Sequence, residues 1–203
     1  DEIRELKATG CLFIISAVEA VDDDILERLD KGHTRDDFIA ALGFARETGI
    51  ALSPTFVAFT PWTTLEGYMR LLQDIIDLRL VNSVAPVQLS IRLLVPAGSC
   101  ILQLEDACDM IGEFDPAILG HPWRNPDPRV DELQQRVQAW TSDAESRGVS
   151  RTEIFHGIRE RAFEVADMPL PPLDLADDGQ GIPRLSENWY CCAEPTCEPL
   201  NSF

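Results

Sequence analysis

The feature that most constrains this chain is a short apolar run, at residues 50–59, that leads through a Thr-Pro-Trp turn into the start of a helix. Thr63 and Glu66 have the spacing of a capping box, so we expect the helix to begin there. Ligands of α/β proteins bind where a strand ends in a turn aimed at a helix N-terminus, because backbone N–H groups and loop side chains converge at that sheet edge. The stretch therefore predicts one wall of a ligand site.

Strands and helices alternate around this stretch. The apolar run at residues 11–18 is typical of a fully buried strand, and residues 86–95 indicate a further one. Helical spacing, with Gly32 and Gly49 as expected stops, predicts helices at residues 25–31, 34–49, 64–78 and 98–110. This order implies parallel strands with right-handed crossovers, so the predicted fold class is α/β.

Three parts are expected along the chain: an α/β part at 1–110, a helical extension at 111–167 and an irregular part at 168–203. The extension should hold two amphipathic helices, at residues 129–147 and 151–166, after a proline-rich connection. Residues 168–186 are rich in Pro, Gly and Asp, which indicates a linker or a wrapped arm. A buried parallel strand at 11–18 needs neighbours on both sides, so we expect the chain to be a fragment whose upstream strands are missing.

Charge and hydropathy exclude several partners. The chain has 17 Lys and Arg against 35 Asp and Glu, a net charge of −18, which argues against nucleic acid and against an anionic membrane surface. It contains neither a signal peptide nor an apolar run of about 18 residues, so we expect a cytoplasmic protein. In that compartment the six cysteines indicate thiols or metal ligands rather than a disulfide framework.

The densest chemistry lies in the last 15 residues, where Cys191, Cys192 and Cys197 fall within seven positions. Three thiols so close together can bind one soft metal or metalloid, or two can cycle through a disulfide that the third resolves. Adjacent cysteines rarely bridge each other without strain, which favours a Cys197 disulfide or a metal site. The alternative is a flexible end that happens to contain cysteine.

Several motifs together resemble the second half of a radical S-adenosylmethionine (radical SAM) enzyme. They include Ser16-Ala-Val-Glu19, Lys31-Gly-His-Thr34, Thr60-Pro-Trp-Thr-Thr64 and Leu94-Val-Pro96-Ala-Gly98. With the tail Cys191-Cys192-Ala-Glu-Pro195, the chain is similar to the CUAEP/CCAEP-tail radical SAM proteins, some of which carry selenocysteine at the second tail position. The resemblance covers most of the chain.

The resemblance implies the C-terminal half of a partial (βα) TIM-like barrel, followed by a helical extension and a cysteine-rich tail. Such enzymes bind a four-iron, four-sulfur (4Fe-4S) cluster and SAM, and receive an electron from a reductase or a ferredoxin. The family's cluster motif, Cys-x-x-x-Cys-x-x-Cys, is absent here, so we expect the cluster ligands upstream and this fragment alone to be inactive. For the parent enzyme, the resemblance leaves open an auxiliary iron–sulfur cluster or a cobalamin.

The same resemblance implies a set of SAM-binding positions. Glu19 would contact the nucleoside or methionyl portion, although Ala20 replaces the Ser of relatives, and Lys31 would lie near the methionine carboxylate. Arg92 lies in an apolar run, and a buried Arg needs a partner, either an anionic ligand or a carboxylate such as Glu105. The full implied set is Glu19, Lys31, Thr55, Val57, Phe59, Arg92 and Pro96.

Each of these residues also has a structural interpretation. Glu19 is suited to capping the next helix, Lys31 to a solvated position at a helix end, and Trp62 to packing instead of covering a ligand. Two functions from different classes therefore stay open. One is a radical SAM enzyme whose tail thiols hold a small-molecule substrate, a metalloid such as arsenic or selenium, or an auxiliary metal site. The other is a non-catalytic redox or metal-binding thiol module on an α/β scaffold.

Overall fold

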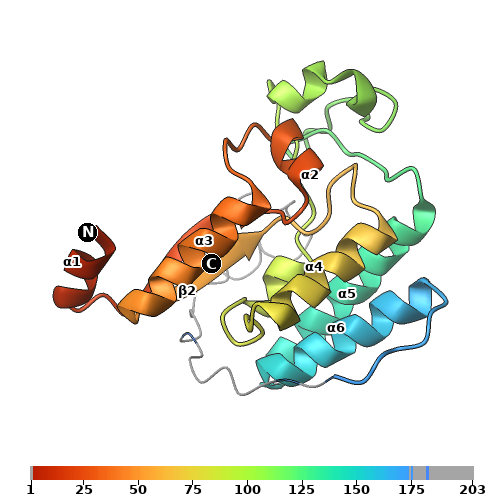
Figure 1. The fold of residues 1–203 in the computed structure, drawn as a ribbon. Helices are drawn as coiled ribbons and strands as arrows, with labels where there is room; N and C mark the ends of the chain where they lie inside the picture. Colours follow the sequence, from red (N-terminus) through yellow and green to blue (C-terminus); the bar gives the residue numbers. More distant parts are fainter. Residues whose placement is uncertain (1, 174, 176–181, 183–203) are drawn as a thin grey trace.

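The computed structural model of the chain describes residues 2–173, 175 and 182 (Figure 1). Within these residues the order is α1 Glu2–Ala8, β1 Phe13–Glu19, α2 Asp23–Arg28, α3 Arg35–Thr48, β2 Ala51–Phe56, α4 Leu65–Asp77, α5 Pro128–Ser146 and α6 Arg151–Val165. Three 3₁₀ helices separate α4 from α5, namely η1 Pro86–Leu89, η2 Cys100–Gln103 and η3 Glu105–Ala107. The combination of helices with a parallel sheet confirms the α/β class.

The sheet consists of β1 and β2, which pair in parallel with Phe13 opposite Ala51 and Ala17 opposite Thr55. The register shifts between Ala17 and Glu19, so β1 ends irregularly. Helix α3 runs alongside β2 (Figure 1), and its apolar face is buried at Phe38, Leu42 and Ala45. The predicted order of strand, helix, helix and strand is thus confirmed for residues 13–56.

Burial of β1 differs from the prediction. Residues 11–18 were expected to be fully buried, yet Leu12 is 73% exposed and Ile15 is 54% exposed. Side chains alternate between the two faces of a strand, and Ile15 and Ala17, which share one face of β1, are both exposed. Apolar side chains on an uncovered strand cannot be removed from water.

The prediction of a third strand at residues 86–95 is wrong for most of that range. Pro86 begins the 3₁₀ helix η1, because proline fixes φ and has no N–H for a ladder. The side-chain oxygen of Gln88 accepts the N–H of Phe56, which satisfies the end of β2 without a strand. Only a short parallel bridge remains, in which Phe59 donates to Ile91 and accepts from Leu93.

The helix predicted at residues 98–110 is also wrong, since η2 and η3 replace it. Ser99 caps η2 by accepting the N–H of Ile101 through its hydroxyl. Leu104 then takes an extended conformation, with φ −78° and ψ 125°, that separates the two short helices. Cys100 and Cys108 therefore do not share one helix.

Helix ends show which local signals were interpreted correctly. Helix α3 begins after Thr34 and ends before Gly49 as predicted, and the structure adds that Thr34 forms a capping box and that Gly49 has φ 73°. The N-cap of α4 is Thr64, whose hydroxyl accepts the N–H of Gly67, and the predicted box at Thr63 and Glu66 does not form. Gly32 was predicted to end α2, but that helix has already stopped at Arg28.

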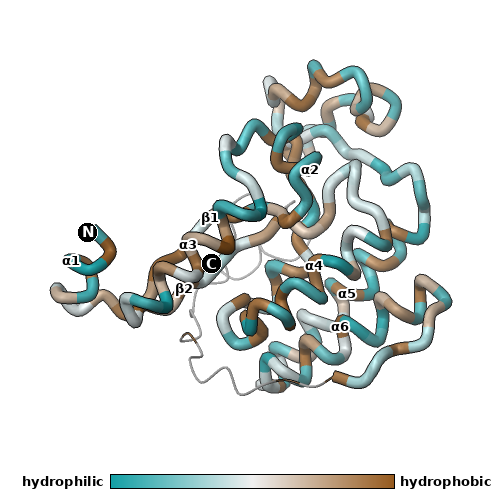
Figure 2. Tube along the Cα trace, viewed as in Figure 1, coloured by the Kyte–Doolittle hydropathy of each residue, from teal (hydrophilic) through white to brown (hydrophobic). Residues whose placement is uncertain are grey.

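The amphipathic helices α4, α5 and α6 confirm the predictions at residues 64–78, 129–147 and 151–166. Helix α6 packs against both α4 and α5, and the three lie side by side in Figure 1. Hydrophobic and hydrophilic positions alternate along them (Figure 2), and their buried faces join one core that extends to β1 and β2. None of the helices in the described part is long and apolar enough to cross a membrane.

A few described residues after α6 contact the rest of the chain. Leu173 and Leu175 pack against the core, and Ile182 is buried. The guanidinium of Arg151 donates to the carbonyl oxygens of Asn82 and Ile182 at 2.6 and 2.8 Å. These contacts place Ile182 beside the N-terminal end of α6.

The packing of α5 on α6 predicts a large effect for Gly157→Ala. A Cβ at Gly157 would lie 2.4 Å from Cε2 of Trp140, a ring fixed by a hydrogen bond from its Nε1 to the carbonyl of Ile154. We expect Gly157→Ala to lower the free energy of unfolding by about 1–3 kcal/mol, measured by urea denaturation. Gly43→Ala is the matched control, because a Cβ there meets nothing within 4 Å and should stabilise α3 by about 0.5–1 kcal/mol. Equal effects of the two substitutions would contradict this account.

Candidate functional site

The site is built around Glu19, the last residue of β1. Its φ of 68° lies in the left-handed region, which is uncommon for a residue other than glycine and is frequent at functional sites. Its carbonyl accepts the N–H of Val57 at 2.9 Å, which continues the pairing of β1 with the chain after β2. Glu19 is only 9% exposed, so a carboxylate is held in a mostly buried position at the carboxyl edge of the sheet.

Lys31 forms an ion pair with Glu19, with its Nζ 2.9 Å from Oε1. The loop after α2 positions this lysine, whose own N–H donates to the carbonyl of Leu26. The ring of His33 holds the same loop against β1, because Nε2 lies 3.1 Å from the carbonyl oxygen of Val18 and Nδ1 lies 3.3 Å from that of Lys31. Glu19 and Lys31 are 12 positions apart in the sequence and were both predicted to bind SAM, and the fold brings them together.

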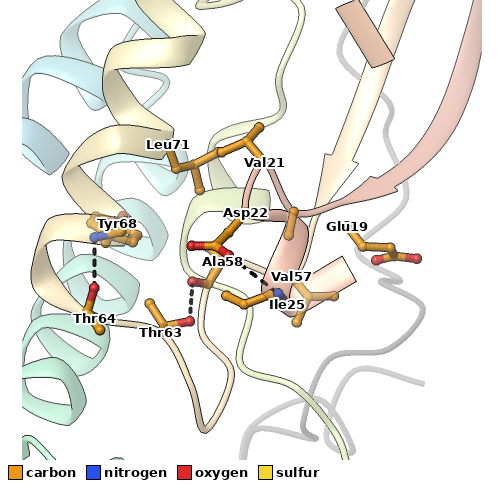
Figure 3. Close-up of a pocket in the computed structure, with 12 residues that line it drawn as sticks. Glu19, Val21, Asp22, Ile25, Val57, Ala58, Thr63, Thr64, Tyr68 and Leu71 are labelled. Atoms are coloured by element: carbon orange, nitrogen blue, oxygen red, sulfur yellow. Dashed lines mark hydrogen bonds between the residues drawn. The ribbon is translucent and has the colours of Figure 1, made fainter. Parts of the chain in front are cut away.

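A pocket adjoins Glu19 between the start of α2 and the start of α4 (Figure 3). It is small and partly open to solvent. Glu19 to Asp22, Val57 and Ala58, and the turn before α4 line it. Figure 3 shows the carboxylate of Glu19 pointing away from Thr63 and Thr64, so the ion pair lies at one side of the pocket.

The wall opposite α2 is the Thr-Pro-Trp turn from which the sequence analysis began. Thr63 accepts the N–H of Thr60 at 2.9 Å through its hydroxyl, which itself donates to the carbonyl of Ala58 at 3.3 Å. Thr64 then begins α4 as its N-cap. The turn is therefore fixed by threonine side chains, and it aims the N-terminus of α4 at the pocket.

The floor of the pocket contains Tyr68, a residue that the sequence analysis missed. Its ring stacks on Phe59 with centroids 4.7 Å apart, and its hydroxyl donates to the carbonyl of Leu89 at 2.8 Å. Burial raises the pKa of Tyr68 far above the usual range of tyrosine, so it stays a neutral hydrogen-bond donor. Its position four residues after the N-cap Thr64, on the inward face of α4, was the signal available in the sequence.

The remaining predicted ligand residues are more scattered. Val57 lines the pocket, Phe59 is fully buried beneath it, and Thr55 is half-buried with its hydroxyl donating to the carbonyl of Ser16. Pro96 is exposed at the end of the segment that follows the bridge. Glu19 does not cap α2, since the side chain of Asp22 does so.

Arg92 has a carboxylate partner within the chain, the second of its two predicted alternatives. Its Nη1 lies 2.7 Å from Oδ1 of Asp131, and its guanidinium lies 3.4 Å from the centre of the Trp123 ring. Its Nη2 also donates to the carbonyl of Trp123. Asp131 is 39 residues further along, in the first turn of α5, so the partner is not the suggested Glu105.

Trp62 and the cysteines complete the list of candidate residues. Trp62 is half-buried beneath the guanidinium of Arg28, which lies 5.6 Å from the ring centre, and its Nε1 has no hydrogen-bond partner. Cys191, Cys192 and Cys197 lie outside the described residues. Within the described part, no three His, Cys, Asp or Glu side chains are grouped to hold a metal ion.

No protein-family model and no curated protein matches this chain. The geometry combines a buried carboxylate paired with an ammonium, a helix N-terminus and a partly apolar pocket. Opposite charges 2.9 Å apart are complementary to the two ends of a zwitterion, whose ammonium can bind Glu19 and whose carboxylate can bind Lys31. Of these two residues, Glu19 lines the pocket and Lys31 lies outside its lining.

The raised pKa of Tyr68 predicts a specific pH dependence of stability. The unfolded chain loses the tyrosine proton near pH 10 while the folded protein keeps it, so stability falls as the pH rises above about 10. Tyr68→Phe removes this dependence, and at neutral pH it costs about 1 kcal/mol because the carbonyl of Leu89 loses its donor. We expect urea unfolding at pH 7 to 10.5 to show the advantage of wild type shrinking above pH 10. A difference that is constant across this range would contradict the buried, neutral hydroxyl.

Proposed function

We propose that this chain is the SAM-binding, C-terminal half of a radical SAM enzyme, with the ligand at the carboxyl edge of β1 and β2. The fold would be half of a partial (βα) TIM-like barrel, completed by strands from the rest of the enzyme. The parallel sheet with helical crossovers supports this reading. So does the joint occurrence of the Glu19, Lys31 and Thr-Pro-Trp motifs in the sequence.

The observation that carries the proposal is the ion pair of Glu19 with Lys31 at the end of β1. The methionyl end of SAM bears one ammonium and one carboxylate, which match the two members of the pair. Glu19 would accept from the ammonium and Lys31 would donate to the carboxylate, with Val57 packing against the apolar part of the nucleoside. The carboxylate of Glu19 is mostly buried, while the ammonium of Lys31 is partly open to solvent.

The uncovered side of β1 supports a larger barrel. Its outer edge is unpaired within the described residues, and Leu12 and Ile15 are exposed there. Parallel sheets are nearly always covered on both faces, and an exposed strand edge is usually short or protected. Further strands of the same enzyme would supply that cover.

The cofactors follow from the proposed class. No group of three ligating side chains lies within the described residues, so the ligands of the 4Fe-4S cluster would come from outside them. When bound, the cluster would pass an electron from a reductase or ferredoxin to SAM and split a carbon–sulfur bond to give a radical. The residues of this chain would bind and orient SAM for that step.

We further propose that Cys191, Cys192 and Cys197 hold the substrate, a metalloid species or an auxiliary metal site. Thiolates prefer soft partners, which suits arsenic, selenium or an iron–sulfur centre. A non-catalytic thiol module on the same scaffold is the alternative. The two differ in whether SAM is bound and cleaved.

Substitutions in the ion pair test the proposal. In the anaerobically reconstituted parent protein, we expect Glu19→Gln and Lys31→Met each to weaken SAM binding about ten- to a hundredfold, because each removes one charge-assisted contact. The measurement is the dissociation constant from isothermal titration calorimetry. Glu27→Gln, an exposed carboxylate on α2, is the matched control and should bind like wild type. Unchanged affinity in both pair variants would exclude this mode of binding.

Removal of the tail should separate cofactor chemistry from substrate chemistry. Every buried hydrophobic residue of the described core lies between Val18 and Ile182. We therefore expect deletion of residues 187–203 to leave the melting temperature and SAM binding unchanged while turnover of the true substrate is abolished. Replacement of Cys191, Cys192 and Cys197 by serine should have the same effect. Full turnover by either variant would refute the role of the tail.

A further inference from the structure

Asn125 occupies a position that its place in a proline-rich connection does not suggest. It is 8% exposed, and its backbone and side chain make four hydrogen bonds. The two protons of its side-chain amide go to the carbonyl oxygens of Pro61 and Thr63, at 3.2 and 2.8 Å. Its Oδ1 accepts the N–H of Asp127 at 2.9 Å. All the polar atoms of this side chain are therefore satisfied within the protein.

Both carbonyl groups that Asn125 binds belong to the turn that forms one wall of the pocket. Thr63 and Thr64 line the pocket directly, and Thr64 begins α4. The hydroxyl of Thr63 holds the inner side of the turn through Thr60, and the Asn125 amide holds its outer side. The turn is thus fixed from both sides.

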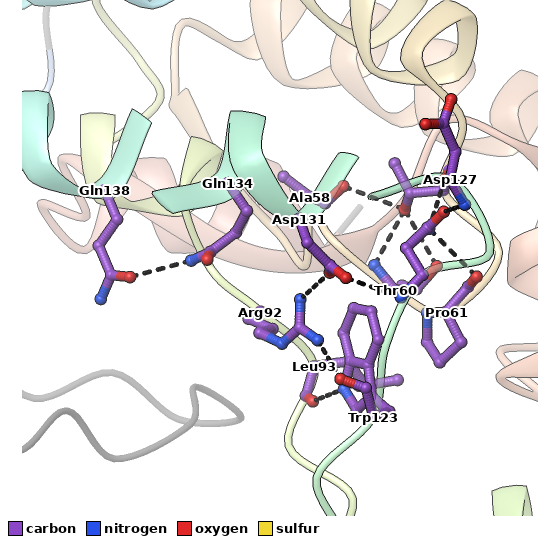
Figure 4. Close-up of polar contacts among 12 residues, drawn as sticks. Ala58, Thr60, Pro61, Arg92, Leu93, Trp123, Asp127, Asp131, Gln134 and Gln138 are labelled. Atoms are coloured by element: carbon purple, nitrogen blue, oxygen red, sulfur yellow. Dashed lines mark hydrogen bonds and ion pairs between the residues drawn. The ribbon is translucent and has the colours of Figure 1, made fainter. Parts of the chain in front are cut away.

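The far end of this contact is anchored in α5. Asp131 accepts the backbone N–H of Asn125 with Oδ2 at 3.1 Å and the guanidinium of Arg92 with Oδ1 at 2.7 Å. Figure 4 shows Arg92 between Asp131 and the ring of Trp123. The carboxylate therefore joins Asn125 to the segment that forms a bridge with Phe59, so the turn, α5 and this segment are linked through Asn125 and Asp131.

We propose that Asn125 is a positioning residue of the pocket: it sets the location of Thr63, Thr64 and the N-terminus of α4 without touching the ligand. This role rests on the proposed function for the ligand's identity, but the placement of the turn is measurable without any ligand. An amide is required because two carbonyl oxygens face its nitrogen. A carboxylate at this position would offer no donor and would face both oxygens with negative charge.

Asn125→Asp tests this role, because it keeps the shape and the acceptor for Asp127 and removes both donors. Gln138→Glu is the matched control: it makes the same chemical change on α5, and its carboxylate still accepts the amide of Gln134. In ¹⁵N-labelled protein we expect the amide signals of Thr63, Thr64 and Gly67 to shift in Asn125→Asp and to stay in place in Gln138→Glu. SAM binding should weaken about tenfold or more in Asn125→Asp alone, the effect of losing hydrogen bonds that orient one wall.

The outcomes separate the two proposals. Failure of wild type to bind SAM overturns the proposed function, while the amide shifts still decide the role of Asn125. Unshifted turn signals together with unchanged SAM affinity in Asn125→Asp overturn the positioning role. If Asn125→Asp does not fold, wild type is titrated with SAM instead. SAM should then shift the side-chain amide signals of Asn125 and leave those of Gln138 in place. Signals of Asn125 that stay in place while SAM binds would also overturn it.

Discussion

The left-handed conformation of Glu19 is the constraint on which the site depends. A residue other than glycine in this region costs about 1–3 kcal/mol, so surrounding contacts have to hold it there. The carbonyl of Glu19 accepts a hydrogen bond from the N–H of Val57, and its carboxylate accepts one from the ammonium of Lys31. Because β1 stops there, the chain turns directly to the N-cap of α2 at Asp22, and this turn forms the second wall of the pocket. One strained residue thus places the charge pair and one side of the cavity.

Local signals in the sequence predicted most of the helices. Periodic apolar residues together with caps such as Thr34 and Gly49 located α3, α4, α5 and α6 to within a residue or two. The failures were in segments 86–95 and 98–110, where hydrophobicity alone suggested regular elements. There Pro86 removes a ladder donor, and the side chain of Gln88 satisfies Phe56 in place of a neighbouring strand. A side chain that substitutes for backbone pairing leaves no periodic pattern to find.

The site was predicted in part for a similar reason. Glu19, Lys31 and the Thr-Pro-Trp turn belong to contiguous motifs near the end of a strand, where α/β topology concentrates ligand contacts. The partners Asp131 and Asn125 come from beyond a long irregular segment, and nothing in their local sequence indicates the turn that they hold. Contacts across such distances in the chain depend on tertiary packing.

We propose that the charge pair at the end of β1 binds SAM for radical chemistry, opposite a turn that threonine and asparagine side chains fix. The most direct test is the parent protein purified and reconstituted without oxygen, given iron, sulfide, a reductant and SAM, with nucleoside products followed by mass spectrometry. The account predicts cleavage of SAM, seen as 5′-deoxyadenosine or, if the other carbon–sulfur bond breaks, as methylthioadenosine. Absence of both products, with no cluster assembled, would contradict it and leave the thiol module as the function to pursue.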